Sequence, residues 1–111
     1  MSEVHGKVAY VCGPMHGLYD LNMRMFEWGV RYAQKAGHVT VINPAQRWEL
    51  AHSSGMDWPT HWRTLVTEML QLADVVYALP GCFSSRYSKV EIDVAKALSI
   101  PIINVPMEEE K

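Results

Sequence analysis

Short apolar segments alternate with longer amphipathic ones along this chain, and this alternation restricts the fold more than any other feature. The segments expected to form buried strands are residues 7–12, 39–42, 73–79 and 101–105. In the stretches between them, apolar residues recur every three to four positions, the period of a helix with one buried face. Such a succession predicts a parallel sheet with helices on both faces and right-handed crossovers. The expected strand order is 2-1-3-4.

The length of the chain allows one such sheet. Its 111 residues can build a single hydrophobic core but not two. We therefore predict one doubly wound α/β domain over residues 1–111, of the Rossmann or flavodoxin-like kind. The expected helices begin at Asp20, near Gln46, at Pro59 or Thr60, and at Ser88.

Composition and charge exclude several classes of protein. Ten basic and twelve acidic residues give a net charge of −2, and no basic cluster is present, so binding to polymeric nucleic acid is not expected. No apolar run approaches the ~20 residues of a membrane span, and the start of the chain lacks the features of a secretory signal. We expect a cytoplasmic protein that binds a small molecule and no membrane.

Cysteine and histidine give no sign of a metal site or a disulfide framework. Cys12 and Cys82 belong to no CxxC pair and are expected to be reduced. The five histidines form no HxxxH or HExxH pattern. The sequence therefore implies neither a metal nor an organic cofactor.

A polar stretch, residues 81–91, follows the third predicted strand and opens the last helix. Because a helix N-terminus carries unpaired N–H groups and partial positive charge, this stretch suits a phosphate or another anion. The binding candidates are Gly81, Ser85, Arg86 and Ser88. Glu91 stands about one turn into the helix, at the margin of the buried stripe. There are two plainer alternatives. The serines could only cap the helix, and Glu91 could be only an acidic residue that the helix dipole stabilises in the first turn.

The loop after the first strand is the second candidate region. In open parallel sheets, ligands bind beyond the carboxyl ends of the strands, where the strand order reverses. With order 2-1-3-4, that point lies between strands 1 and 3, so Gly13, Pro14 and Met15 should face the polar stretch across one crevice. The alternative is that these residues form only a tight connection between strand and helix.

Three tryptophans invite a base-stacking interpretation, because aromatic faces bind nucleobases. Trp62 shares a helical stripe with Leu65 and Met69 and is expected to lie mainly in the core, so Trp48 is the better stacking candidate. The segment 46–55, which ends in a turn-rich sequence, is expected to form a lid.

Several motifs resemble the nucleoside 2-deoxyribosyltransferase-like family, particularly its compact phage and bacterial branch of unknown function. They are Tyr10-Val11-Cys12-Gly13-Pro14-Met15 with Gly17 and Asn22, Ala36-Gly37-His38 before Val41-Ile42-Asn43-Pro44, Ala73-Asp74 before Leu79-Pro80-Gly81, and Ser85 to Glu91 with Ala95 and Leu98. The resemblance implies an enzyme that breaks or exchanges the N-glycosidic bond of deoxynucleosides or their monophosphates. It implies Glu91 as nucleophile, Asn22 in the base or sugar pocket, and a homo-oligomer.

A nucleophilic carboxylate agrees with the chemistry of glycosyl transfer, whose transition state resembles an oxocarbenium ion. A leaving base must also be protonated by a second acid. The family's second acid corresponds to Val66 here, and Glu68, two residues further on, is the candidate to replace it. The sequence leaves a second hypothesis open: a nucleotide-binding protein without turnover. A flavodoxin-like interaction module is a third, which the polar stretch argues against.

Overall fold

The computed structural model describes residues 8–14 and 22–107, apart from the side chain of Met69. Four parallel strands form one sheet in the order β2-β1-β3-β4. The strands are β1 (Val8–Cys12), β2 (Thr40–Ile42), β3 (Val75–Ala78) and β4 (Ile102–Asn104). This confirms the predicted α/β class and strand order.

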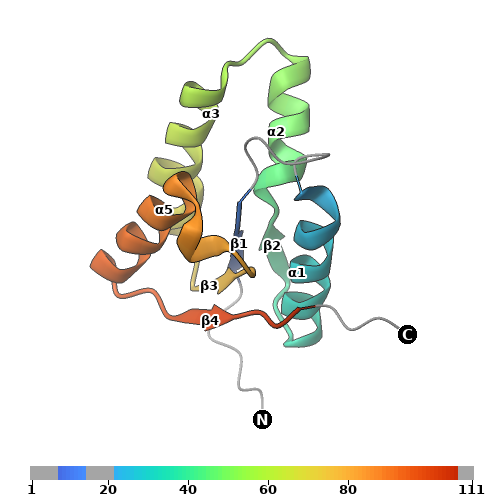
Figure 1. Ribbon diagram of the computed structural model, residues 1–111, viewed down its shortest axis with the longest axis vertical. Helices are drawn as coiled ribbons and strands as arrows, with labels where there is room; N and C mark the ends of the chain where they lie inside the picture. Colours follow the sequence, from blue (N-terminus) through green and yellow to red (C-terminus); the bar gives the residue numbers. More distant parts are fainter. Residues whose placement is uncertain (1–7, 15–21, 108–111) are drawn as a thin grey trace.

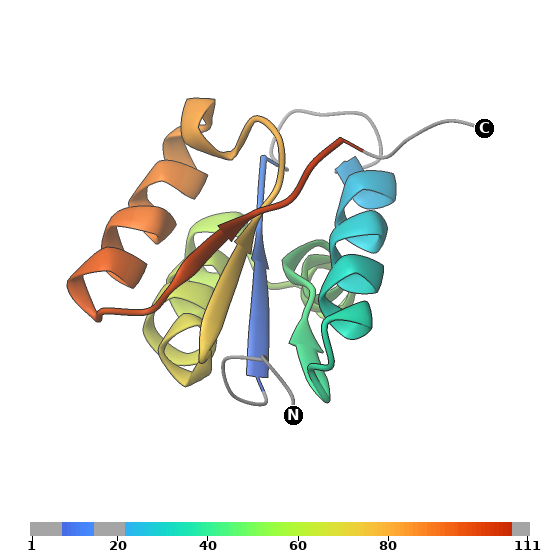
Figure 2. The ribbon, with the colours of Figure 1, turned by 90° about the horizontal axis from the view of Figure 1, so that it is seen from below.

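Helices cover both faces of the sheet, as Figure 2 shows. They are α1 (Met23–Lys35), α2 (Pro44–Ser53), α3 (Trp58–Thr64), a π-helical turn η2 (Leu65–Met69), α4 (Leu70–Leu72), a 3₁₀ turn η3 (Cys82–Ser84) and α5 (Arg86–Ala97). α2 follows β2 directly and forms a helical hairpin with α3 (Figure 1). In the described parts of the chain, no helix has the length and apolar character needed to cross a membrane.

The two faces of the sheet build two separate halves of the core, because successive residues of a strand point to opposite sides. On β1, Ala9 and Val11 pack in one cluster with Phe26 of α1. Tyr10 and Cys12 belong to the other cluster, together with the buried face of α5. We call these sides the α1 face and the α5 face. The alternation thus places Tyr10 and Cys12 beneath α5.

The helix starts follow local capping rules. Asn43 Oδ1 accepts the backbone N–H groups of Ala45 and Gln46, so α2 begins at Pro44, two residues before the predicted position. Ser85 Oγ likewise accepts the Ser88 N–H at 3.4 Å, and α5 begins at Arg86 rather than Ser88. The predicted start at Asp20 lies outside the described residues.

The helix expected to run from Pro59 or Thr60 to the third strand is divided into α3, η2 and α4. The Leu70 N–H bonds to the Leu65 carbonyl, five residues back, as in a π-turn. Leu65 and Leu70 are both completely buried. In a regular α-helix, residues five apart point in different directions, so the wider turn lets both leucines reach the same core.

Candidate functional site

Glu91 is an ionisable side chain in the core, on the face of α5 that packs against β1. Only 6 % of it is exposed, and its helical neighbours Ile92 and Ala95 are fully buried. The Tyr10 hydroxyl donates a hydrogen bond to Oε2 at 3.0 Å, and the Cys12 thiol donates one to Oε1 at 3.2 Å. The sequence predicted a position at the margin of the buried stripe, and the structure places the carboxyl deeper than that.

Burial decides the protonation of this group. Removal from water raises the pKa of Glu91 to about 7, against the opposing effect of the hydrogen bonds from Cys12 and Tyr10. The buried Trp62 N–H also lowers this pKa by its proximity, although it lacks the geometry of a hydrogen bond. Glu91 therefore changes its charge near neutral pH.

The two donors keep their protons in the same range. Burial and the neighbouring Glu91 charge raise the pKa of Tyr10 well above its usual value. The contact with Cys82, followed by burial, raises the pKa of the Cys12 thiol in the same direction. Both groups consequently serve as hydrogen-bond donors that hold each carboxylate oxygen in a fixed orientation.

A narrow cleft leads to Glu91. It is lined by Gly13, Pro44, Trp58, Trp62, Ser85, Tyr87, Ser88 and Glu91. The Tyr87 ring lies edge-on to Trp58 and Trp62, with centroids 5.5 and 5.2 Å apart. These rings fill the space so that a volume of about 10 Å³ remains, enough for about one water molecule.

The loops after β1 and β3 meet beside this cleft, as the switch-point argument predicted. Gly13 packs against Leu79 so tightly that a Cβ atom would lie 2.7 Å from Leu79 Cδ1. Gly81 has a positive φ of 86°, and a Cβ there would lie 3.4 Å from Pro14 Cγ. A side chain at Gly13 would therefore force the loops apart.

The structure brings together part of the predicted site. Gly13, Ser85, Ser88 and Glu91 line the cleft, and Pro14 and Gly81 lie close to each other. Ser85 caps α5, as the plainer alternative proposed, and lines the cleft as well. Met15 lies outside the described residues.

Other candidates are directed elsewhere. The Asn22 side chain donates to the Pro14 carbonyl at 2.9 Å and holds the start of α1 near β1. Arg86 is exposed, with its guanidinium carbon 5.9 Å from the centre of the Tyr87 ring. Glu68 is exposed on η2 and is not among the residues that line the cleft.

The expected roles of Trp48 and Trp62 are reversed. Trp62 lines the cleft, whereas Trp48 packs behind Trp58 at 5.4 Å and against His61 at 5.2 Å. The helical stripe predicted that Trp62 lies mainly in the core, whereas it is half-buried and forms part of the cleft wall, because α3 passes along the cleft. Trp48 instead joins the two helices of the hairpin.

Sequence reasoning gave no role to Tyr10 and Cys12 as partners of Glu91. One signal was present: the two residues stand two apart at the carboxyl end of a strand and so share a face. What the sequence does not show is that this face meets the second turn of α5. The wall formed by Trp58 and Tyr87 depends on the same packing of distant segments.

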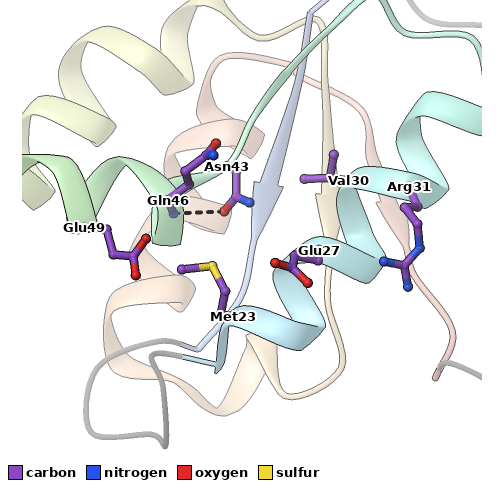
Figure 3. A pocket seen from close by; sticks show the side chains of 7 residues that line it. All are labelled: Met23, Glu27, Val30, Arg31, Asn43, Gln46 and Glu49. Carbon is purple, nitrogen blue, oxygen red and sulfur yellow. Dashed lines mark hydrogen bonds between the residues drawn. The ribbon is translucent and has the colours of Figure 1, made fainter.

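A larger hollow of about 500 Å³ lies between α1 and α2 (Figure 3). It is lined by Met23, Glu27, Val30, Arg31, Asn43, Gln46 and Glu49. It shares no lining residue with the Glu91 cleft, although Asn43 lines the hollow and the next residue, Pro44, lines the cleft. Its two carboxylates, Glu27 and Glu49, come from facing helices and are exposed to solvent (Figure 3).

No group of three or more metal-ligating side chains suited to a metal ion occurs within residues 8–14 and 22–107. The described side chains at the cleft supply one buried carboxyl, its phenol and thiol donors, the serines of a helix N-terminus and aromatic rings.

Fold and site together define a doubly wound α/β protein with a buried carboxyl at the switch point of its sheet. Residues 7–104 match the model of a family described as a domain of unknown function (DUF4406), and the chain belongs to that family. Comparisons with curated proteins and with solved structures found no match.

Proposed function

We propose that this protein cleaves the N-glycosidic bond of a (deoxy)nucleoside or nucleoside 5′-monophosphate, or exchanges its base, with Glu91 as the nucleophile. The observation that carries the proposal is the Glu91 carboxyl itself, buried at the switch point and held by Tyr10 and Cys12. Its resemblance to nucleoside 2-deoxyribosyltransferase-like proteins supplies the class of substrate.

The environment of Glu91 suits an oxocarbenium-like transition state. A carboxylate in a site shielded from water stabilises developing positive charge more strongly than an exposed one. Its attack on C1′ would give a glycosyl-enzyme, which water or a second base then resolves. Tyr10 keeps its proton and orients Oε2, so Tyr10 acts as a positioning residue for this step.

The N-terminus of α5 would hold the sugar or phosphate end of the substrate. Ser85 and Ser88 line the cleft there, and the helix dipole favours an anion at that position. Arg86 lies next to them and would reach a phosphate only after leaving the ring of Tyr87.

Protonation of the leaving base needs a second acid. Among the described residues that line the cleft, Glu91 is the only carboxyl. We therefore propose that this proton comes either from water or from a neighbouring copy of the chain in a homo-oligomer. We also propose that the protein acts in the cytoplasm.

A substrate enters only if the cleft widens. Small-molecule pockets are usually about 300–1,000 Å³, far above the space left beside Glu91. Trp58, Trp62 and Pro44 belong to the α2–α3 hairpin, so movement of this hairpin, together with rotation of Tyr87, would open the cleft. This extends the expectation of a lid at residues 46–55 to the whole hairpin.

The test is an incubation with deoxynucleosides and their 5′-monophosphates, with and without a free acceptor base, followed by chromatography of the bases. We expect Glu91→Gln to lower turnover by at least ~10³-fold, as removal of a nucleophile does. Glu68→Gln, at an exposed carboxylate, is the matched control and should keep full turnover. Equal turnover by wild type and Glu91→Gln would rule out this role.

The pH dependence gives a second readout. A nucleophile must be ionised, so kcat/KM should rise with pH through about 7, the pKa of Glu91. A rate that falls over the same range would mean that Glu91 acts in its protonated form.

A nucleotide-binding protein without turnover is the second candidate. The lack of a second carboxyl among the described residues that line the cleft favours it. It predicts that nucleotides raise the melting temperature of both wild type and Glu91→Gln, with no base released by either.

A further inference from the structure

Cys12 and Cys82 lie in contact next to Glu91, and the proposed glycosidic chemistry does not need the second of them. Cys12 is the last residue of β1, and Cys82 is the first residue of η3. Both side chains are 0 % exposed, and both thiols are free. Their Sγ atoms are 3.1 Å apart.

We propose that Cys12 and Cys82 form a reversible disulfide, which makes this pair a redox modification site beside Glu91. The S–S bond of a disulfide is about 2.05 Å long, so the two sulfur atoms have to approach by about 1 Å. Cys12 ends β1 just before one of the two loops that meet at the switch point, and Cys82 lies in the connection after β3. The bond would therefore link these two connections covalently.

The oxidant class is a hydroperoxide. Its terminal oxygen is transferred to one cysteine sulfur, which gives a sulfenic acid and releases an alcohol, or water from hydrogen peroxide. The second thiol then attacks that sulfur, the S–O bond breaks, and water leaves with the remaining protons. The two cysteines lose two electrons and two protons in total, and a dithiol reductant reverses the change.

The bond would alter Glu91 directly. The Cys12 thiol donates a hydrogen bond to Oε1 at 3.2 Å, and a disulfide sulfur has no proton to donate. The carboxylate would keep only the bond from Tyr10 to Oε2. Oxidation therefore makes the charged form of Glu91 less favourable and withdraws an interaction that orients it.

Two features make the product specific. The chain contains only these two cysteines, so no other intrachain pairing competes. Both thiols are buried, so they meet each other more readily than a thiol of another molecule once a small oxidant has entered. The reaction should accordingly be independent of protein concentration.

The test treats the purified chain with hydrogen peroxide, then removes the oxidant and unfolds the protein for thiol counting and mass measurement. We expect both thiols to disappear, the mass to fall by two hydrogens, the chain to stay monomeric on a non-reducing gel, and a dithiol to restore both thiols. Cys82→Ser and Cys82→Ala are paired controls in which the loss of two hydrogens should not occur.

Two results would overturn the proposal. One is that both thiols survive peroxide treatment, even when it is repeated in denaturant at concentrations just below those that unfold the protein. The other is that they are lost only by addition of oxygen atoms or by linkage between chains. These readouts need no substrate, so their failure is distinguishable from failure of the proposed enzyme activity.

The effect on Glu91 is measured separately, by NMR titration of its carboxyl carbon in the reduced and oxidised protein. We expect the titration midpoint to move to higher pH on oxidation. An unchanged midpoint would show that the disulfide does not act on Glu91 and would remove that part of the proposal.

Discussion

Two buried tyrosines, one on each face of the sheet, bind an ionisable side chain through their hydroxyl groups. On the α5 face, Tyr10 bonds to Glu91 at 3.0 Å. On the α1 face, Tyr77 bonds to His38 at 2.8 Å. Glu91 and His38 are both buried, yet of these two only Glu91 lines the cleft.

Tyr10 and Tyr77 stand at adjacent levels of the sheet, because Tyr10 pairs with Val76 and Val11 pairs with Tyr77. The difference lies in where the ionisable partner of each tyrosine stands. His38 precedes β2 and so lies toward the amino ends of the parallel strands, where ligands are not expected. Tyr77 is also packed edge-on by the rings of His38 and Tyr32, at 5.3 and 6.0 Å. A buried, hydrogen-bonded ionisable group is thus a structural feature on the α1 face and a candidate site on the α5 face.

The largest expected effect concerns the pH dependence of stability. The pKa of Glu91 rises from 4.5 to about 7 on folding, so the folded state holds a proton that the unfolded state has released. Stability from this group is therefore greatest below pH 4.5 and falls as pH increases to about 7, by roughly 3 kcal/mol. Glu91→Gln should remove this fall.

The free energy of unfolding of wild type and Glu91→Gln is measured by urea unfolding between pH 4 and pH 8, in steps of about one pH unit. The difference between the two pH profiles gives the contribution of Glu91. Tyr77→Phe, on the other face, serves as control and should keep the wild-type slope. Parallel pH profiles for wild type and Glu91→Gln would contradict the raised pKa.

The two tyrosine pairs can be compared directly by removing each hydroxyl. A hydrogen bond to a charged group contributes about 1.5–3 kcal/mol, so Tyr10→Phe should raise the pKa of Glu91 further, by about one unit or more. Tyr77→Phe should leave the Glu91 titration unchanged and cost about 1 kcal/mol of stability through its lost bond to His38. NMR titration of the Glu91 carboxyl distinguishes the two variants. Equal changes of the Glu91 pKa in Tyr10→Phe and Tyr77→Phe would contradict the difference between the two faces.

The helix caps on the two sides offer a smaller contrast. Asn43 caps α2 with two accepted N–H groups, whereas Ser85 caps α5 with one at 3.4 Å. Both Asn43→Ala and Ser85→Ala should cost about 1 kcal/mol, with the larger loss at Asn43. Denaturant unfolding checks the stabilities, and only Ser85→Ala should also weaken nucleotide binding, if the cleft is the ligand site.

The smallest effects are expected at exposed carboxylates. Glu68 on η2 and Glu27 on α1 are both exposed, so Glu68→Gln and Glu27→Gln should each change stability by less than about 0.5 kcal/mol. Thermal unfolding and turnover assays check both variants. A large loss of turnover in Glu68→Gln alone would restore Glu68 as the second acid, against its exposed position.

Local patterns accounted for much of the architecture. The strands, their order and the meeting of the loops after β1 and β3 were predictable, because strand–helix alternation and the handedness of crossovers leave few topologies. The π-turn at Leu65–Met69 was not, because it depends on two leucines reaching the same core. Of the site, Glu91, Gly13, Ser85 and Ser88 were found from their positions at element ends.

The sequence by itself determined the parallel sheet, its switch point and the placement of Glu91 early in the last helix, since these follow from periodicity, turn residues and caps that act over a few neighbouring positions. Tertiary structure alone decided that Tyr10 and Cys12 bind the Glu91 oxygens, that Cys82 touches Cys12, and that Trp62 rather than Trp48 lines the cleft. These contacts join residues about 70 to 80 positions apart, and their geometry depends on how helices pack on the sheet, which no local pattern specifies.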